Sequence, residues 1–388
     1  LVWLLLTTAS LPVENASADF QPSPWQGSVG RVEEPESSAS FVSTVAGDQE
    51  VSYPPMPAEA NDFIPPDQFR GDSSPDPYPI WGLTYADVLP YFQTDDSLRG
   101  LAPISDPEPT WGYSLFVDYD AFRGVSDGGW GNYGLHTGAN LGTRLGRFSD
   151  WTGIGFQAGA SVGVFDWAGT DYRIAKNNAA ETQGFITYGL YRKPDENSRW
   201  NAAIVHDWML NNNFGVFAAS PLLSQLRMQL GYAMSASNEL GIWGAVRTGT
   251  DSRIVPHFGS TTWRSVNQIS AYWRHKWSYG GPDTTISVGL PEQTRLAGGG
   301  SLGDYLITLA ANAPLSDAVS LYANVTYMHQ SASLGAIGSN DEAWNFSIGI
   351  AVYPRRNARF TTIAGQRWMP QMPVANNGSF LVDTSQKF

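Results

Sequence analysis

Two neighbouring segments with the same alternating pattern, residues 133–145 and 154–164, constrain this chain most. In both, apolar residues take nearly every second position, and glycine or polar residues fill the positions between them. A period of two is typical of β-strands, whose successive side chains point to opposite faces. A turn at residues 147–150 would join the two strands into a hairpin and would place Gly142 opposite Gly155.

The length of these strands favours a membrane protein. Roughly eleven residues in a tilted strand cross a bilayer, whereas a soluble β-sandwich would show the same alternation in shorter strands. The sequence has no run of eighteen apolar residues, which excludes a helical span. A charged fraction of only 15% and 40 glycines among 388 residues fit a barrel whose apolar band is interrupted at every second position. We therefore predict an all-β fold, an antiparallel up-and-down transmembrane β-barrel.

About twelve strands are expected between residues 111 and 354, which we predict to form the barrel. Tight turns follow the even-numbered strands, and longer connections follow most of the odd-numbered ones. This asymmetry is typical of outer-membrane barrels, and it predicts that both termini lie on the short-turn, periplasmic side. The expected strands are residues 111–124, 130–146, 151–167, 181–193, 199–211, 223–236, 238–249, 263–279, 283–291, 303–313, 317–330 and 342–354.

The chain before the barrel is expected to have three parts. Residues 1–18 are predicted as a secretory signal peptide with a truncated start, because an apolar core precedes a small-x-small site. Residues 19–80 are predicted as a disordered, acidic, Pro- and Ser-rich linker, since they cannot bury enough apolar surface to offset the entropy of ordering. Residues 81–110 are a candidate plug or periplasmic cap.

The charge of the chain is unevenly distributed. Residues 1–110 carry 3 basic and 17 acidic residues, whereas residues 111–388 carry 20 and 19. The absence of a basic surface argues against a nucleic-acid partner. The acidic linker is a candidate to bind a periplasmic or cell-wall partner. Residues 355–388 lose the alternation after the last strand, and we predict a periplasmic C-terminal tail.

Five motifs in the chain stand out. They are Gly138-Ala139-Asn140-Leu141-Gly142-Thr143-Arg144, Thr152-Gly153-Ile154-Gly155-Phe156-Gln157, Gly169-Thr170-Asp171-Tyr172-Arg173, Gln366-Arg367-Trp368-Met369-Pro370 and Asn377-Gly378-Ser379-Phe380-Leu381-Val382-Asp383. With these motifs the chain resembles a family of uncharacterised exported outer-membrane β-barrel proteins, a domain of unknown function, from planctomycete-type bacteria. The resemblance covers residues 111–388 and leaves the linker out. It implies an outer-membrane location and brings no substrate and no catalytic residues.

Charged residues expected to face the lumen are the only candidates for chemistry. Asp118 and Asp120 share one strand face with Cα atoms about 6.8 Å apart, a spacing that suits Ca²⁺ binding or hydrolysis. The favoured interpretation is that they pair with interior basic residues. His206 and Asp207 are adjacent, so they point to opposite faces and form no dyad. The lumen-facing candidates are Asp118, Asp120, His136, Arg144, Arg192, Arg227, Arg247, Arg274 and Lys276.

No motif for a metal site, a cofactor or a catalytic centre is found, and we predict none. The function predicted is an outer-membrane β-barrel without catalysis, either a narrow porin-like channel or a structural surface protein. Its expected partners are outer-membrane lipid and a small solute or ion. The inward glycines of residues 133–164 either let large side chains fill the lumen or widen a passage. Two alternatives stay open: a membrane-embedded hydrolase that uses lumen or loop carboxylates, and a secreted soluble β-sandwich that binds a ligand.

Overall fold

A computed structural model describes most of the chain from Thr110 onward, all of it within the second of the two units into which the chain divides, Asp76–Phe388. The predicted signal peptide and linker, and residues 81–109, lie outside the described residues. Among the described residues, no helix is long and apolar enough to cross a membrane. The described residues are 110–128, 130–167, 169, 179–195, 198–277, 281–297, 302–330, 342–354, 358 and 367–386.

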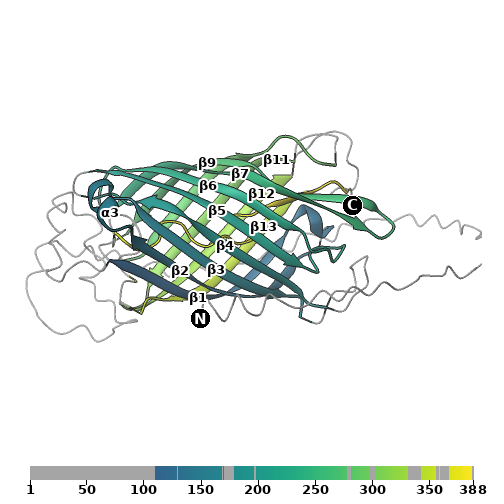
Figure 1. Cartoon of the computed structure of the whole chain (residues 1–388), viewed down its shortest axis with the longest axis horizontal. Helices are drawn as coiled ribbons and strands as arrows, with labels where there is room; N and C mark the ends of the chain where they lie inside the picture. Colours follow the sequence, from purple (N-terminus) through teal and green to yellow (C-terminus); the bar gives the residue numbers. More distant parts are fainter. Residues whose placement is uncertain are drawn as a thin grey trace, which may run out of the picture. The chain divides into compact units, whose positions relative to one another are not determined.

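Twelve antiparallel strands form a closed barrel, which confirms the predicted fold class (Figure 1). Each strand pairs with its neighbours in the chain, β9 pairs with β7, and β13 closes the sheet by pairing with β1. The strands are β1 (Trp111–Arg123), β2 (Asn132–Arg144), β3 (Gly155–Phe165), β4 (Glu181–Arg192), β5 (Trp200–Asn212), β6 (Leu222–Ala233), β7 (Asn238–Val255), β9 (Gln268–Lys276), β10 (Asp283–Pro291), β11 (Gly303–Pro314), β12 (Val319–Gln330) and β13 (Ala343–Val352).

Two further strands extend the sheet at one end of the barrel. The first half of β7 pairs with β9, and its second half forms a hairpin with β8 (Gly259–Ser265). A short strand near the C-terminus, β14 (Val382–Thr384), adds to β8. The predicted strand 263–279 was therefore wrong, because it merged the end of β8 with β9. The two strands separate at Asn267, whose side chain accepts a hydrogen bond from the backbone N–H of Arg247 at 2.6 Å.

The hairpin predicted at residues 133–164 is present, but its register differs from the predicted one. Gly142 lies opposite Gln157 and not opposite Gly155, so the predicted glycine pairing is wrong by two residues. A short helix, α3 (Arg147–Thr152), replaces the expected four-residue turn. The Ser149 hydroxyl holds this connection, since it accepts the backbone N–H of Leu145 and donates to the carbonyl of Ile154, both at 2.5 Å.

The two faces of the sheet have opposite chemistry. Outward side chains are large and apolar, such as Ile186 at 40% and Val288 at 55% exposure. Inward side chains are mostly polar, and Gln157, Gln183 and Gln225 are fully buried. A soluble protein would show the reverse arrangement, whereas an apolar outer surface around a polar interior is typical of a barrel in a bilayer.

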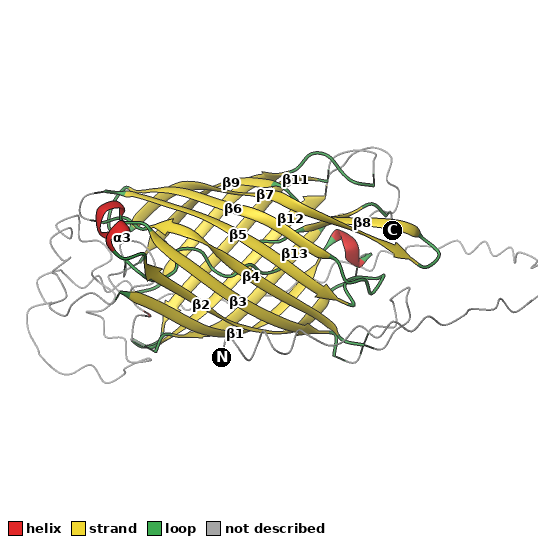
Figure 2. Cartoon of the chain, in the orientation of Figure 1, coloured by secondary structure: helices red, strands yellow, loops and turns green. Residues whose placement is uncertain are grey.

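The connections also differ between the two ends of the barrel (Figure 2). The connections that follow β4, β6, β9 and β11 are short, and we call this the short-turn end. The connections that follow β1, β3, β5, β10 and β12 are longer, and the β7–β8 hairpin projects from the same side. We call this the long-loop end. The predicted asymmetry of the connections is present except after β2, where the connection at the short-turn end includes α3 and is longer than those after β1 and β5.

A buried carboxyl group lies in the connection between β1 and β2, at the long-loop end of the barrel. Asp127 ends the 3₁₀-helix η4 (Val125–Asp127) and is 1% exposed. Its Oδ2 accepts the backbone N–H of Gly124 at 2.6 Å. Burial, helped by the neighbouring Asp166, raises the pKa of Asp127 from 3.8 to about 7, although the hydrogen bond from Gly124 opposes the shift.

The stability of this connection should therefore depend on pH. The folded state binds a proton more tightly than the unfolded state, so the connection is most stable below pH 4 and loses stability as the pH rises through about 7. Asp127→Asn keeps an acceptor for Gly124 and cannot ionise. We expect amide hydrogen-exchange protection at Gly124, corrected for intrinsic rates, to fall at least about tenfold between acidic and alkaline pH in the native chain. The variant should show no such fall, and an equal fall in both proteins would contradict this prediction.

Candidate functional site in the barrel lumen

The C-terminal segment, residues 367–386, runs through the inside of the barrel (Figure 1). It begins at the short-turn end, where an added Cβ on Gly142 would lie 2.4 Å from the carbonyl oxygen of Trp368. It ends at the long-loop end, where the carbonyl of Leu381 accepts the backbone N–H of Val266 at 2.8 Å before β14 begins. The segment therefore connects the two ends of the barrel.

Inward side chains supply the hydrogen bonds that the backbone of this segment needs. The carbonyl of Met372 accepts from the side-chain amides of Asn140 at 2.9 Å and Gln157 at 3.0 Å. Farther along, the backbone N–H of Ala375 donates to the Thr187 hydroxyl at 2.9 Å. A buried backbone without such partners would be costly. Polar inward side chains thus provide the hydrogen bonds that the backbone of a neighbouring strand provides in a sheet.

This path corrects the prediction of a periplasmic C-terminal tail. The segment does not leave the barrel after β13 but passes through its lumen. Trp111 lies at the short-turn end and Gln386 at the long-loop end, where it contacts Thr261 of β8. The two ends of the described barrel chain therefore cannot lie on the same side, and the prediction that they do is wrong. Residues 367–386 contact inward side chains of several strands, so they need not follow the alternation of a strand.

The inward glycines make room for other parts of the chain. Added Cβ atoms on Gly134 and Gly163 would lie within 2.8 and 2.5 Å of the Phe165 ring. An added Cβ on Gly159 would lie 2.5 Å from Val374 of the C-terminal segment. Of the two interpretations of these glycines, the one in which they accommodate bulk inside the barrel fits the structure.

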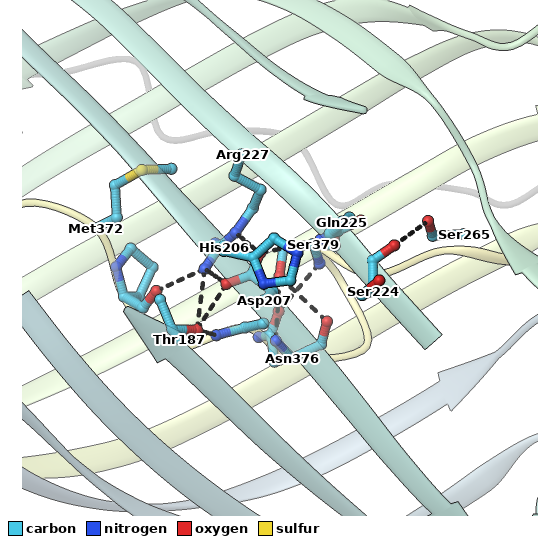
Figure 3. A network of polar contacts seen from close by, with 12 residues as sticks. Thr187, His206, Asp207, Ser224, Gln225, Arg227, Ser265, Met372, Asn376 and Ser379 are labelled. Atoms are coloured by element: carbon cyan, nitrogen blue, oxygen red, sulfur yellow. Dashed lines mark hydrogen bonds and ion pairs between the residues drawn. The ribbon is translucent and has the colours of Figure 1, made fainter. Parts of the chain in front are cut away.

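A buried ion pair between β5 and β6 holds the middle of the segment (Figure 3). The Arg227 guanidinium donates to both carboxylate oxygens of Asp207, at 2.5 and 2.9 Å, and its Nη2 also donates to the carbonyl of Pro373 at 2.9 Å. Gln225 donates to Asp207 at 3.3 Å and to the carbonyl of Ser379 at 3.0 Å. Asp207 is 0% and Arg227 2% exposed. His206 faces outward and contacts Thr248 at 3.0 Å, so the prediction that His206 and Asp207 point apart is confirmed.

Asp118 and Asp120 both face the lumen, as predicted, but their partners differ from those expected. Asp118 Oδ2 accepts from the Tyr322 hydroxyl at 2.5 Å and lies 3.1 Å from Nδ1 of His136. Asp120 accepts from the side-chain amides of Asn345 and Asn377. Among the described residues neither carboxylate forms an ion pair with Lys or Arg, so that favoured interpretation is wrong. Asp120 instead binds the C-terminal segment through Asn377.

Four of the basic residues predicted to face the lumen do so. Arg227, Arg247, Arg274 and Lys276 lie on the inward faces of their strands, with Arg274 3.1 Å from Glu239 and Arg247 3.0 Å from Glu292.

Two other predicted residues lie near the short-turn end. Arg144 follows the inward alternation of β2 but is one-third exposed and contacts Asp150 of α3 at 2.8 Å. Arg192 is the one predicted residue that does not lie on the inward face of its strand. It shares the face of β4 that carries the outward residues Ile186 and Leu190, and it lies 3.8 Å from Asp195, so its lumen assignment is wrong.

Sequence reasoning missed several lumen residues that bind the segment or pair with the predicted ones: Asp207, Thr187, Gln225, Glu239 and Tyr322. One signal was available for Asp207. It shares the period of Asn201 and Asn211, and the opposite face of β5 carries Trp200 and Leu210. That pattern predicts an inward Asp207. The partner on another strand could not be predicted, because strand alternation gives no distances across a barrel.

Two apolar clusters close the long-loop end. The first joins β4, β5, β6 and β8 to the C-terminal segment, with Phe185, Met209, Leu223, Trp263 and Phe380 among its members. The second joins η4, β11, β12 and β13 to the same segment through Leu381. Because Phe380 and Leu381 are adjacent, the segment links the two clusters. Side chains from both walls therefore pack against the segment between them at this end of the lumen.

A cavity remains between the segment and the wall formed by β9 to β13. Its volume is about 390 Å³. It is bordered near the short-turn end by Asp283 and Asn312 and deeper in the barrel by Thr326 and Ser379. Among the described residues, no group of three or more His, Cys, Asp and Glu side chains could hold a metal ion.

An apolar outer surface, a polar lumen and a closed antiparallel sheet define a barrel of the outer-membrane type. The chain belongs to a family of unknown function, DUF6666, whose model matches residues 112–382. A search of curated proteins finds no match.

Solved structures similar to the chain include an outer membrane channel from Pseudomonas putida F1, with 10% identity over 64% of this chain and 98% of that one, at a TM-score of 0.42. The NanC porin has 10% identity over 61% of this chain and 98% of that one, at 0.35. The translocator domain of the autotransporter NalP from Neisseria meningitidis has 13% identity over 66% of this chain and 91% of that one, also at 0.35. These likenesses are distant.

The buried pair of Asp207 and Arg227 should contribute strongly to stability. Arg227→Met leaves the Asp207 carboxylate buried without its ion-pair partner, and we expect a loss of about 3–5 kcal/mol in the free energy of unfolding. The exposed pair of Arg253 and Asp251, 2.8 Å apart, provides a matched control. Arg253→Met should cost less than about 1 kcal/mol. Denaturant unfolding of the three proteins measures both, and equal losses would contradict this prediction.

The position of β14 can be tested by a disulfide, because the chain contains no cysteine. Ser265 and Val382 are register partners on β8 and β14, and such partners have Cα atoms about 4.5–5.5 Å apart, within the range of a disulfide. The variant with Ser265→Cys and Val382→Cys should cross-link on mild oxidation of the folded protein. Ser260→Cys with Val382→Cys is the control, since Ser260 pairs with Ile254 instead. Mass spectrometry of the digested protein should find only the first cross-link.

Proposed function

We propose that the chain is an outer-membrane β-barrel of the channel-like kind, whose own C-terminal segment keeps the lumen closed at the long-loop end. The observation that supports this most is the segment itself. It crosses the whole lumen, and its residues Phe380 and Leu381 join the two apolar clusters. A solute that entered at the short-turn end would reach the cavity and then meet this apolar seal.

The location in the outer membrane follows from the outer surface. Every backbone polar group of a closed sheet is paired, so the barrel can stand in hydrocarbon. Short turns face the periplasm in outer-membrane barrels and long loops face outward. With that orientation, the first strand begins in the periplasm and residues 382–386 lie on the outer side.

We propose no catalysis. The two carboxylates considered for hydrolysis have different tasks, since Asp118 is held by His136 and Tyr322 and Asp120 binds the C-terminal segment through Asn377. A general acid and a general base must both reach the substrate, and Asp120, which is 1% exposed, does not line the cavity that Asp118 borders. The filled lumen also suits a structural surface protein, and conductance measurements separate that role from a gated channel.

Conductance in a planar bilayer tests the proposal. The intact protein should be nearly silent at low voltage, because the segment and the two apolar clusters block the lumen. A variant that ends at residue 366 should conduct steadily. If that variant does not fold, Phe380→Ser with Leu381→Ser opens the seal while leaving Asp207, Arg227 and Asp120 in place.

Two controls accompany this experiment. Heat-modifiable migration on a gel shows that each variant is a folded barrel. Ile254→Ser changes an apolar residue that is 87% exposed on the β7–β8 hairpin, away from the seal, and it should stay silent. Steady conductance from the intact protein, or silence from a folded barrel that lacks the segment, would overturn the proposed function.

A further inference from the structure

The wall of the cavity opposite the C-terminal segment is built from ordered rows of small polar residues. Register pairs place Ser287 of β10 beside Thr308 of β11, and Thr308 beside Thr326 of β12. One step toward the short-turn end, Asn324 of β12 lies beside Ser347 of β13. All five side chains line the cavity. The wall therefore presents hydroxyl and amide groups from four adjacent strands toward one space.

Several of these groups have hydrogen-bonding capacity that the protein does not use. Thr308 and Thr326 contact each other at 3.3 Å. Ser287, Asn324 and Ser347 form no side-chain hydrogen bond within the described part of the chain, although Ser287 and Ser347 are 3% and 2% exposed. A hydroxyl can donate once and accept twice, and an amide can do both. Polar groups that line a cavity in this state are available to a ligand or to water.

The charged groups around the same cavity already have partners. Arg227 is paired with Asp207 at 2.5 Å and Arg274 with Glu239 at 3.1 Å. Asp118 accepts the Tyr322 hydroxyl and contacts His136, and Asp283 accepts from the side-chain amide of Asn312 at 3.4 Å. An ionic ligand would lose its hydration on entry without meeting a charged group that has no partner. The cavity therefore favours an uncharged ligand.

Aromatic and aliphatic surfaces complete the lining. Phe116, Trp243, Tyr272, Tyr322 and Tyr353 border the cavity. Ligand pockets are typically lined by such surfaces together with a few polar groups, and their volumes run from about 300 to 1,000 Å³. A volume of about 390 Å³ lies at the lower end of this range, which suits a small molecule.

We infer that this cavity is a binding site for a neutral, hydroxyl-rich small molecule, with the size of a mono- or disaccharide. Ser287, Asn324 and Ser347 hydrogen-bond its hydroxyl groups, and the aromatic rings contact its carbon skeleton. The ligand enters from the short-turn end, because the apolar clusters close the other end. This site goes beyond the proposed channel function, since it requires neither conduction nor an open seal.

Isothermal titration with maltose tests the inference on the full chain, in a detergent without a sugar headgroup. We expect saturable binding of maltose and weaker binding of glucuronate and glucosamine, which carry opposite charges. Asn324→Ala and Ser347→Ala should each weaken binding about fivefold, the effect of one hydrogen bond. Thr137→Ala removes an exposed hydroxyl from the outer face of β2 and should leave the affinity unchanged.

A second pair of variants tests whether the ligand occupies the cavity. Ala310→Phe fills the space beside Asn324 and should abolish binding, whereas Ala139→Phe adds the same ring to the outer face of β2 and should not. No saturable binding of maltose, tighter binding of a charged sugar, or full affinity in the folded Ala310→Phe variant would overturn the inference. Because titration needs no membrane, its result is independent of the conductance that tests the proposed function.

Discussion

The pairing of β1 with β13 is the constraint on which the rest of the structure depends. It runs without a break from Leu115 opposite Val352 to Arg123 opposite Trp344. A sheet that did not close would leave a row of unpaired backbone groups, which hydrocarbon cannot satisfy. Closure also creates an interior that water and side chains must fill, and the inward face of every strand is adapted to that interior.

The polar interior has a second consequence, because it can accept an extended segment of the same chain. The C-terminal segment makes no ladder with a strand until β14, yet its backbone groups need partners. Asn140, Gln157 and Thr187 supply them from β2, β3 and β4. The residues that make the lumen polar are thus the residues that hold the segment, and the filled half of the lumen lies against these strands.

Charged residues inside the barrel also help to hold the C-terminal segment. Asp207 pairs with Arg227 and Glu239 with Arg274, whereas Asp120 is held by the side-chain amides of Asn345 and Asn377. At the long-loop end, Oδ2 of Asp383 in β14 lies 2.9 Å from Nη2 of Arg264 and also accepts the backbone N–H of Leu296. Burial raises the pKa of Asp383, and these two contacts oppose the shift. Paired charges therefore fix the segment at its middle and at its end.

The sequence by itself determined the all-β fold, the closed barrel of about twelve strands, the faces of residues such as Leu135 and Asp118, and the difference between the two ends. These properties depend on alternation and on the length of connections, which are local. Only the tertiary structure decided that residues 367–386 fill the lumen, that Asp207 binds Arg227, and that Arg192 faces away. Alternation assigns a side chain to a face, but contacts across the lumen depend on how twelve strands close, and no single strand carries that information.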